Sequence, residues 1–161
     1  MRHHHALALV LAAAFVAGGP AHGCGAERAA HYQALAPLEA EVIETGNWSQ
    51  LTEPVERVIR TPEEWLAFYR SHAPAQPPPV VDFTRHMVVA VLLPRRTGGY
   101  AVTLDRLEET PDALIVHYTE ERPGPDAVVI QALTQPHVFA TVPRRDKPVQ
   151  FAHQERLSGP P

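Results

Sequence analysis

The run M-V-V-A-V-L-L from Met87 to Leu93 decides the fold. A continuous apolar run of this length predicts a central strand that is covered on both faces. Close by, the residues of the segment 100–104 alternate between two faces, which is the pattern of a second strand. Further short strands are predicted over residues 41–47, 56–59, 114–119, 128–133, 137–142 and 149–152. We expect the last two to form a hairpin through residues 143–147.

One helix is predicted ahead of the central strand, over residues 61–72. Thr61 is suited to the N-cap, Pro62 to the first helical position and Glu64 to a capping box. An apolar stripe at i, i+3 and i+4 then faces the core through Trp65, Phe68 and Tyr69. The expected fold class is therefore α+β, a mostly antiparallel sheet or sandwich of about seven or eight short strands with this one amphipathic helix.

The N-terminal sequence predicts that the protein is exported. Residues 6–18 are apolar throughout, too few to span a bilayer but typical of a secretory signal. The only cysteine, Cys24, follows Ala21-His22-Gly23, which places small residues at −3 and −1 of a cleavage site. Cleavage there leaves Cys24 as the first residue, ready for lipid attachment, and predicts an anchored protein of a bacterial envelope, periplasmic or surface-facing. The alternative is a soluble secreted protein with an incidental cysteine.

The expected organisation is a signal peptide over residues 1–23, a tether or helical spacer over 24–40, and a single β-rich domain over 41–153. A disordered tail over 154–161 completes it. The apolar fraction of 45% is enough for a core, which excludes a disordered chain. A net charge of −4 without a basic stripe argues against nucleic acid as a partner.

Catalytic and metal-binding patterns are missing from the sequence. The serines at 49, 71 and 158 lie in no nucleophile-elbow pattern, and the histidines beyond Cys24 are scattered singly without H-x-x-x-H or H-x-H spacing. Carboxylate pairs at Glu63-Glu64, Glu108-Glu109 and Glu120-Glu121 are interpreted as a helix start and as solvated strand ends. We therefore predict neither enzyme activity, nor a cofactor, nor a metal site. An enzyme with an unrecognised site stays open, and a deep cleft with converging titratable groups would reveal it.

Three stiff loops are the candidate recognition surface. They combine glycines that permit tight turns, prolines that fix the backbone, and side chains with polar tips. The candidate residues are Thr97, Gly98, Gly99, Tyr100, Pro123, Gly124, Pro125, Gln135, Pro136 and His137. The alternative is that these residues form sheet turns and bind nothing.

Over residues 81–151, the chain resembles the C-terminal domain of the protease-complex subunit PrcB family. The matching elements are Asp82-Phe83, the run from Met87 to Leu93, Arg96-Thr-Gly-Gly-Tyr100, Pro123-Gly124-Pro125 and Thr134-Gln135-Pro136-His137. Members are envelope lipoproteins or secreted proteins, and the named example is an accessory subunit of a surface protease complex. The resemblance implies a non-catalytic, protein-binding role, with an envelope or surface protein such as a protease as the partner and the membrane reached through an N-terminal lipid. His137 stands where an aromatic residue often follows the T-Q-P triplet.

The order of the three loops is also similar to that of chagasin-like peptidase inhibitors, which present three loops to a cysteine peptidase. Their N-P-T-T-G pattern and R-P-W element are missing here. A peptidase inhibitor is therefore the alternative function.

Overall fold

The computed structural model describes residues 38–158, which form two sheets and one helix. The first sheet has the strand order β1-β6-β3-β2 and the second the order β4-β5-β7. In chain order the elements are β1 (Glu41–Gly46), β2 (Val55–Ile59), α1 (Pro62–His72), β3 (His86–Leu92), β4 (Ala101–Glu109), β5 (Leu114–Arg122), β6 (His137–Pro143) and β7 (Val149–Leu157). All pairs are antiparallel except β5 and β7. The predicted α+β fold class, mostly antiparallel, is confirmed.

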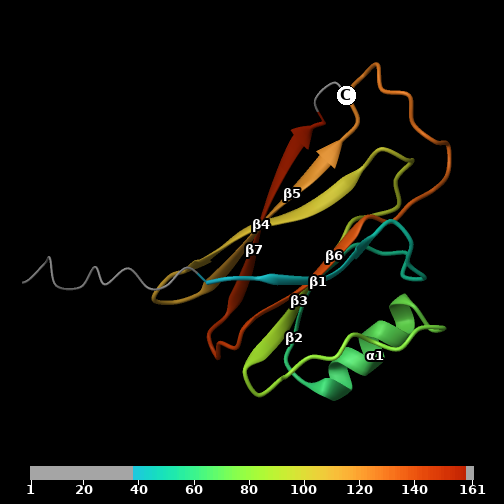
Figure 1. Ribbon diagram of the computed structural model, residues 1–161. Coiled ribbons are helices and arrows are strands. Elements are labelled where there is room, and N and C mark those ends of the chain that lie inside the picture. Colours follow the sequence, from blue (N-terminus) through green and yellow to red (C-terminus); the bar gives the residue numbers. More distant parts are fainter. Residues whose placement is uncertain (1–37, 159–161) are drawn as a thin grey trace, which may run out of the picture. The chain divides into compact units, whose positions relative to one another are not determined.

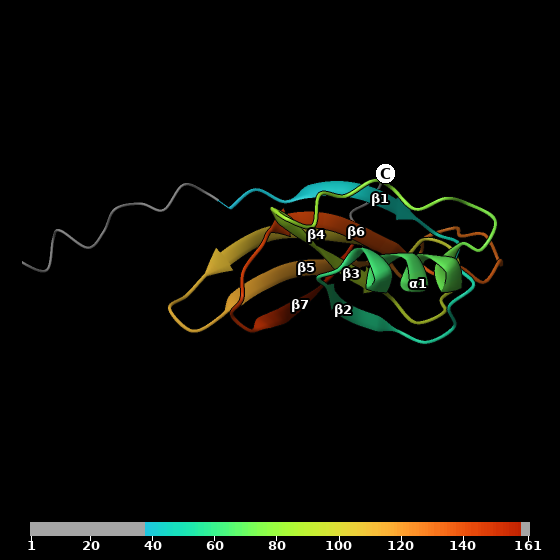
Figure 2. The same ribbon diagram turned by 90° about the horizontal axis from the view of Figure 1, so that it is seen from below.

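The central strand β3 is covered on both faces, as its continuous apolar run predicts. Val88 and Ala90 pack in one cluster with the aromatic side chains of α1, whereas Met87 and Val89 pack with Leu114 of the second sheet. The helix and the second sheet therefore lie on opposite faces of the first sheet (Figures 1 and 2). Because successive side chains of a strand point to opposite faces, a strand between two layers must be apolar at every position.

The helix α1 begins and ends as predicted. The Thr61 side chain accepts a hydrogen bond from the Glu64 amide (3.2 Å), and Pro62 occupies the first turn. The Glu64 carboxylate accepts from the Arg60 amide (3.0 Å), one residue before the cap. The buried face of the helix consists of Trp65, Phe68, Tyr69 and His72.

The predicted strand over residues 128–133 is wrong. These residues belong to a loop over 123–136, here called the long loop, which leads from the second sheet back to the first (orange in Figure 1). Its only ladder contact is an isolated bridge between Thr134 and Arg96. An apolar run becomes a strand only where a sheet edge pairs with it, and here the backbone is crossing between two sheets.

The predicted hairpin between the last two strands is also wrong, because β6 and β7 belong to different sheets. β7 pairs in parallel with β5, from Leu114 opposite Val149 to Arg122 opposite Leu157. Residues 154–157, predicted to be part of a disordered tail, therefore continue the strand. The long strand β5 provides backbone hydrogen-bonding groups along its whole length, and this segment pairs with them. The polar, exposed sequence of residues 154–157 gives no sign of that pairing.

The signal peptide, Cys24 and the tether up to residue 37 lie outside the described residues, as do residues 159–161 of the tail. Residues 38–40, the end of the predicted tether, are not helical, and Leu38 packs against the core between the sheets. Among the described residues, no helix has the length and apolar character needed to cross a membrane.

Candidate functional site

The predicted glycine loop meets the long loop, which contains the second predicted loop and the third as far as Pro136, at one end of the two sheets, and backbone hydrogen bonds join the two segments. The glycine turn, residues 96–100, lies against the long loop. Arg96 and Thr134 exchange both backbone hydrogen bonds (2.9 and 2.6 Å), and the Gly98 amide donates to the Ile130 carbonyl (3.0 Å). The Thr134 hydroxyl also donates to the carbonyls of Arg96 and Thr97. The two loops therefore form one structural unit.

Both glycines of the turn are required by this contact. A Cβ on Gly98 would lie 2.3 Å from Cγ1 of Ile130, and a Cβ on Gly99 would lie 2.5 Å from Cγ1 of Val129. Gly99 also has a φ of +87°, a conformation that residues with a side chain rarely adopt. The pair of glycines is thus what lets the long loop approach the turn.

The long loop presents apolar side chains to the solvent. Val128 is fully exposed, and the side chains of Ile130 and Leu133 are 64% and 60% exposed. Pro125 and Thr97 are exposed nearby, while Pro123, Gly124 and Tyr100 are half-buried. We call Val128, Ile130 and Leu133 the apolar loop surface. The sequence does not reveal this surface, because the strand predicted over 128–133 would bury alternate residues.

The third predicted loop is buried, so its side chains are not available for recognition. Gln135 and His137 are 3% exposed, and Pro136 is fully buried. The backbone of this segment joins the first sheet: the Gln135 amide donates to the Asn47 carbonyl (2.8 Å), and the Pro136 carbonyl accepts from the Leu93 amide (2.9 Å). Its role is to start β6.

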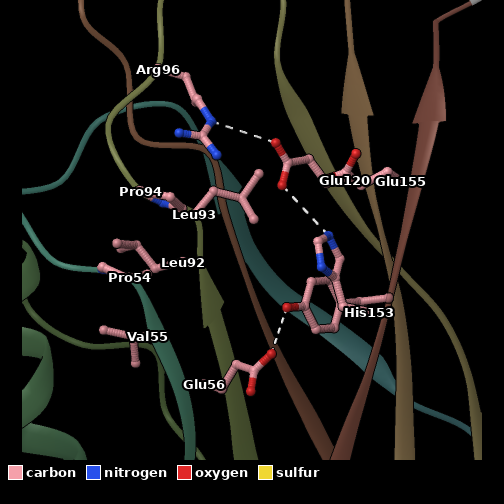
Figure 3. A pocket seen from close by; sticks show the side chains of 11 residues that line it. Pro54, Val55, Glu56, Leu92, Leu93, Pro94, Arg96, Glu120, His153 and Glu155 are labelled. Atoms are coloured by element: carbon pink, nitrogen blue, oxygen red, sulfur yellow. Dashed lines mark hydrogen bonds and ion pairs between the residues drawn. The ribbon is translucent and has the colours of Figure 1, made fainter.

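A cavity of about 410 Å³ lies beside the glycine turn, between the ends of β2 and β3 on one side and β5 and β7 on the other (Figure 3). Its apolar wall includes Leu92, Leu93 and the two prolines at 54 and 94. The polar groups that line it are Glu56, Arg96, Tyr118, Glu120, His153 and Glu155. We call it the acidic pocket, because it contains three carboxylates and one guanidinium.

Glu120 is the central polar group of the acidic pocket. Its side chain is only 4% exposed, and its carboxylate lies 3.5 Å from both Nε of Arg96 and Nε2 of His153. The prediction that Glu120 belongs to a solvated strand end is therefore wrong. The alternation of β5 carried the signal, since Val116, Tyr118 and Glu120 share the buried face of the strand.

The neighbours of Glu120 are held by pairs of their own. The Tyr118 hydroxyl donates to Glu56 (2.5 Å), and burial together with this carboxylate raises the pKa of Tyr118 well above its ordinary value. Glu155 accepts from Arg122 (2.6 Å), and Arg96 lies over the ring of Tyr100, 5.6 Å from its centre. The arrangement suits the binding of a positively charged or hydrogen-bond-donating group, since carboxylates predominate.

Apart from the acidic pocket, the fold brings together three residues that the sequence does not connect: Glu44, His72 and His137. Nε2 of His72 lies 2.7 Å from Oε1 of Glu44, and Nε2 of His137 lies 3.6 Å from the same oxygen. Burial is the main cause that lowers the pKa of His137. The linear spacing of these residues gave no signal, because they come from β1, α1 and β6.

Residues 87–143 match the family described as PrcB C-terminal. The match begins in β3, ends with β6, and contains the glycine turn and the whole long loop. It confirms the resemblance found in the sequence. No curated protein and no solved structure matches the chain.

Proposed function

Because residues 87–143 match the PrcB C-terminal family, we propose that this protein is a non-catalytic accessory subunit that binds a protein partner in a protease complex. It works at the bacterial cell envelope, where it is held by a lipid on Cys24. Its family match and the absence of a catalytic pattern in the sequence support the accessory role. The apolar segment of residues 6–18 and the single cysteine support the envelope location.

The apolar loop surface is the observation that carries the proposal. It lies inside the segment that matches the family, and its three apolar side chains face the solvent. Several exposed apolar side chains within one short loop favour a protein-binding surface. The backbone bonds to Arg96 and Gly98 hold this loop in place, so binding costs less conformational entropy than it would for a free loop.

The acidic pocket supplies the second, more selective part of the proposed interface. It opens beside the same glycine turn and shares Arg96 with it. A lysine or arginine of the partner would complement Glu56, whose hydrogen-bond partner is the neutral Tyr118 hydroxyl, while the partner's apolar groups cover the long loop. Charge complementarity of this kind selects partners more than it adds affinity.

A site-specific photo-crosslinker tests the proposal in the organism's own envelope. It is placed at Val128 and, as the matched control, at Val80, which is equally exposed but lies in the loop that follows α1. We expect a crosslink to a protease or a protease-complex subunit from position 128 and none from position 80. Equal crosslinking from both positions, or a product without any protease-complex protein, contradicts the proposal.

The envelope location and the alternative function have separate tests. Mass spectrometry of the mature N-terminus is expected to show an acylated Cys24, and Cys24→Ser is expected to release the protein from membranes. The alternative, a chagasin-like inhibitor, needs three exposed loops, and burial of Gln135, Pro136 and His137 leaves two. Inhibition of a papain-type peptidase at micromolar protein would favour that alternative over the accessory role.

A further inference from the structure

Two imidazoles and one carboxylate converge where three elements meet. Glu44 comes from β1, His72 ends α1 and His137 begins β6. One ring nitrogen of each histidine and a carboxylate oxygen of Glu44 all lie within 4.8 Å of one another. The histidines are 2% and 3% exposed, and the Glu44 side chain is 20% exposed. We call these three residues the histidine cluster.

Nδ1 of each imidazole already has a hydrogen-bond partner. Nδ1 of His137 lies 3.1 Å from the Gln135 carbonyl, which can only accept, so this nitrogen carries a hydrogen. In the neutral ring, Nε2 then has a free lone pair that faces the Glu44 carboxylate. Nδ1 of His72 lies 2.9 Å from the Ser49 hydroxyl, which can accept or donate. Nε2 of His72 lies 2.7 Å from a Glu44 oxygen, which can only accept, so this nitrogen carries the hydrogen of the neutral ring. Because the Ser49 hydroxyl can also accept, the hydrogen can move to Nδ1 when a metal ion binds Nε2.

This pattern is that of a metal site. Histidine ligands of metals usually donate their other ring N–H to a carbonyl or a similar group, which fixes the ring. Two imidazoles with one carboxylate form a donor set used by zinc and other first-row metals, with positions left for water. Without a cation, the lone pair of His137 and the carboxylate would face each other in a buried place and repel.

The residues around the histidine cluster also favour a metal site over a chance contact. A Cβ at Gly46 would lie 3.2 Å from Nε2 of His137, so a glycine keeps the space beside that nitrogen free. The Tyr69 ring packs against the His72 imidazole, with ring centres 5.5 Å apart, and so helps to hold that imidazole in place. Glu44 is the most exposed member of the cluster and marks the side from which an ion would enter.

We propose that Glu44, His72 and His137 bind a divalent transition metal ion, zinc in the first place, which ties β1, α1 and β6 together. The ion stabilises the folded state, because an unfolded chain does not hold the three ligands together. The proposal is independent of the accessory role, since the cluster shares no residue with the apolar loop surface or the acidic pocket.

A second group, Glu120, His153 and Glu155, shows why the histidine cluster is favoured. It contains a single imidazole, and both carboxylates already have arginine partners, Arg96 for Glu120 and Arg122 for Glu155. A metal ion would have to displace these two arginine contacts, whereas among the described residues the ion-pair partners of Glu44 are only the two histidines. His153 is 37% exposed, so its ring is also less fixed. This second group is the matched control for metal binding.

The test uses the full mature protein, first treated with a chelator and then supplied with Zn²⁺ or Co²⁺. We expect one zinc ion per chain after buffer exchange, a rise in Tm with zinc, and visible absorption by the Co²⁺ form. Glu44→Gln preserves a hydrogen-bond acceptor for His72 and is expected to fold, yet to lower zinc affinity by at least about tenfold. His137→Gln is expected to have the same effect.

His153→Gln is expected to bind zinc as the wild type does. The proposal is overturned if the wild-type protein retains no zinc and gives no Co²⁺ absorption, in which case the cluster is a hydrogen-bond network only. It is also overturned if His153→Gln loses the ion while Glu44→Gln and His137→Gln retain it. The readings on the wild-type protein remain decisive even if a variant does not fold.

Discussion

On the α1 side of the first sheet, aromatic side chains bury one another, whereas at the loop end three apolar side chains face the solvent. Trp65, Phe68 and Phe139 pack with ring centres 5.3 to 6.0 Å apart. At the loop end, Val128, Ile130 and Leu133 have no comparable cover. The first region is expected to determine stability and the second to determine binding, so mutations should separate the two properties.

The largest effect on stability is expected from Phe68→Ala. Phe68 is 5% exposed and packs against Trp65 and Phe139, so its removal leaves a cavity between α1 and the first sheet. A loss of about 3–5 kcal/mol in the free energy of unfolding is expected, measured by urea denaturation. Leu66→Ala in the same helix is the control, because Leu66 is 38% exposed. Equal losses in the two variants would contradict a core on this side.

A smaller loss of stability, with a loss of partner binding, is expected from Gly99→Val. The new side chain must adopt a positive φ and displace Val129 and Pro123, which pushes the long loop away from the turn. We expect a cost of about 1–3 kcal/mol. Gly124→Ala is the matched control, since a Cβ there meets only the Ser158 carbonyl at an ordinary 3.8 Å. If both variants unfold at the same urea concentration, the loop contact is not what requires the glycine.

The same two regions differ in how far sequence predicts them. The helix, its cap and the central strand follow from local patterns, and each was confirmed at its expected place. The strand over 128–133 was predicted wrongly, because apolar composition does not say whether a sheet edge is available. Likewise the parallel pairing of β7 with β5 depends on residues far apart in the chain.

The candidate sites show the same division. Gly98 and Gly99 could be singled out because a glycine pair is a local signal, and the structure gives them a close contact. His137 is predicted to belong to the recognition surface, but the first sheet buries it beside His72 and Glu44. These residues come together only through the pairing of β1 with β6 and the packing of α1. Their spacing in the sequence does not predict that they lie close to one another.

An acid-dependent effect is expected at the other end of the second sheet, away from both regions. Hydrogen bonds from Arg145 first, and then from Lys147, lower the pKa of Glu109 below its ordinary value of 4.5. The contacts of Glu109 with these two basic residues therefore stabilise the fold above about pH 4.5 and cease to do so as the pH falls through the lowered pKa. Glu109→Gln should flatten the fall in stability below pH 4.5, measured by urea denaturation at several pH values. The control is Glu108→Gln, because Glu108 is the more exposed neighbour. If this variant flattens the curve equally, the pH dependence does not come from Glu109.

The smallest effect on stability, and the sharpest separation of the two regions, is expected from Val128→Ser combined with Ile130→Ser. Both side chains are exposed, so the free energy of unfolding should change by no more than about 0.5 kcal/mol for each substitution. Crosslinking to the partner, with the probe now at Leu133, should fall strongly, because the apolar contact is lost. Val80→Ser is the control for the loss of an exposed valine elsewhere. If the double variant is as stable as the wild type and still reaches the partner, the long loop is only a connection between the sheets. The partner must then be sought at another face.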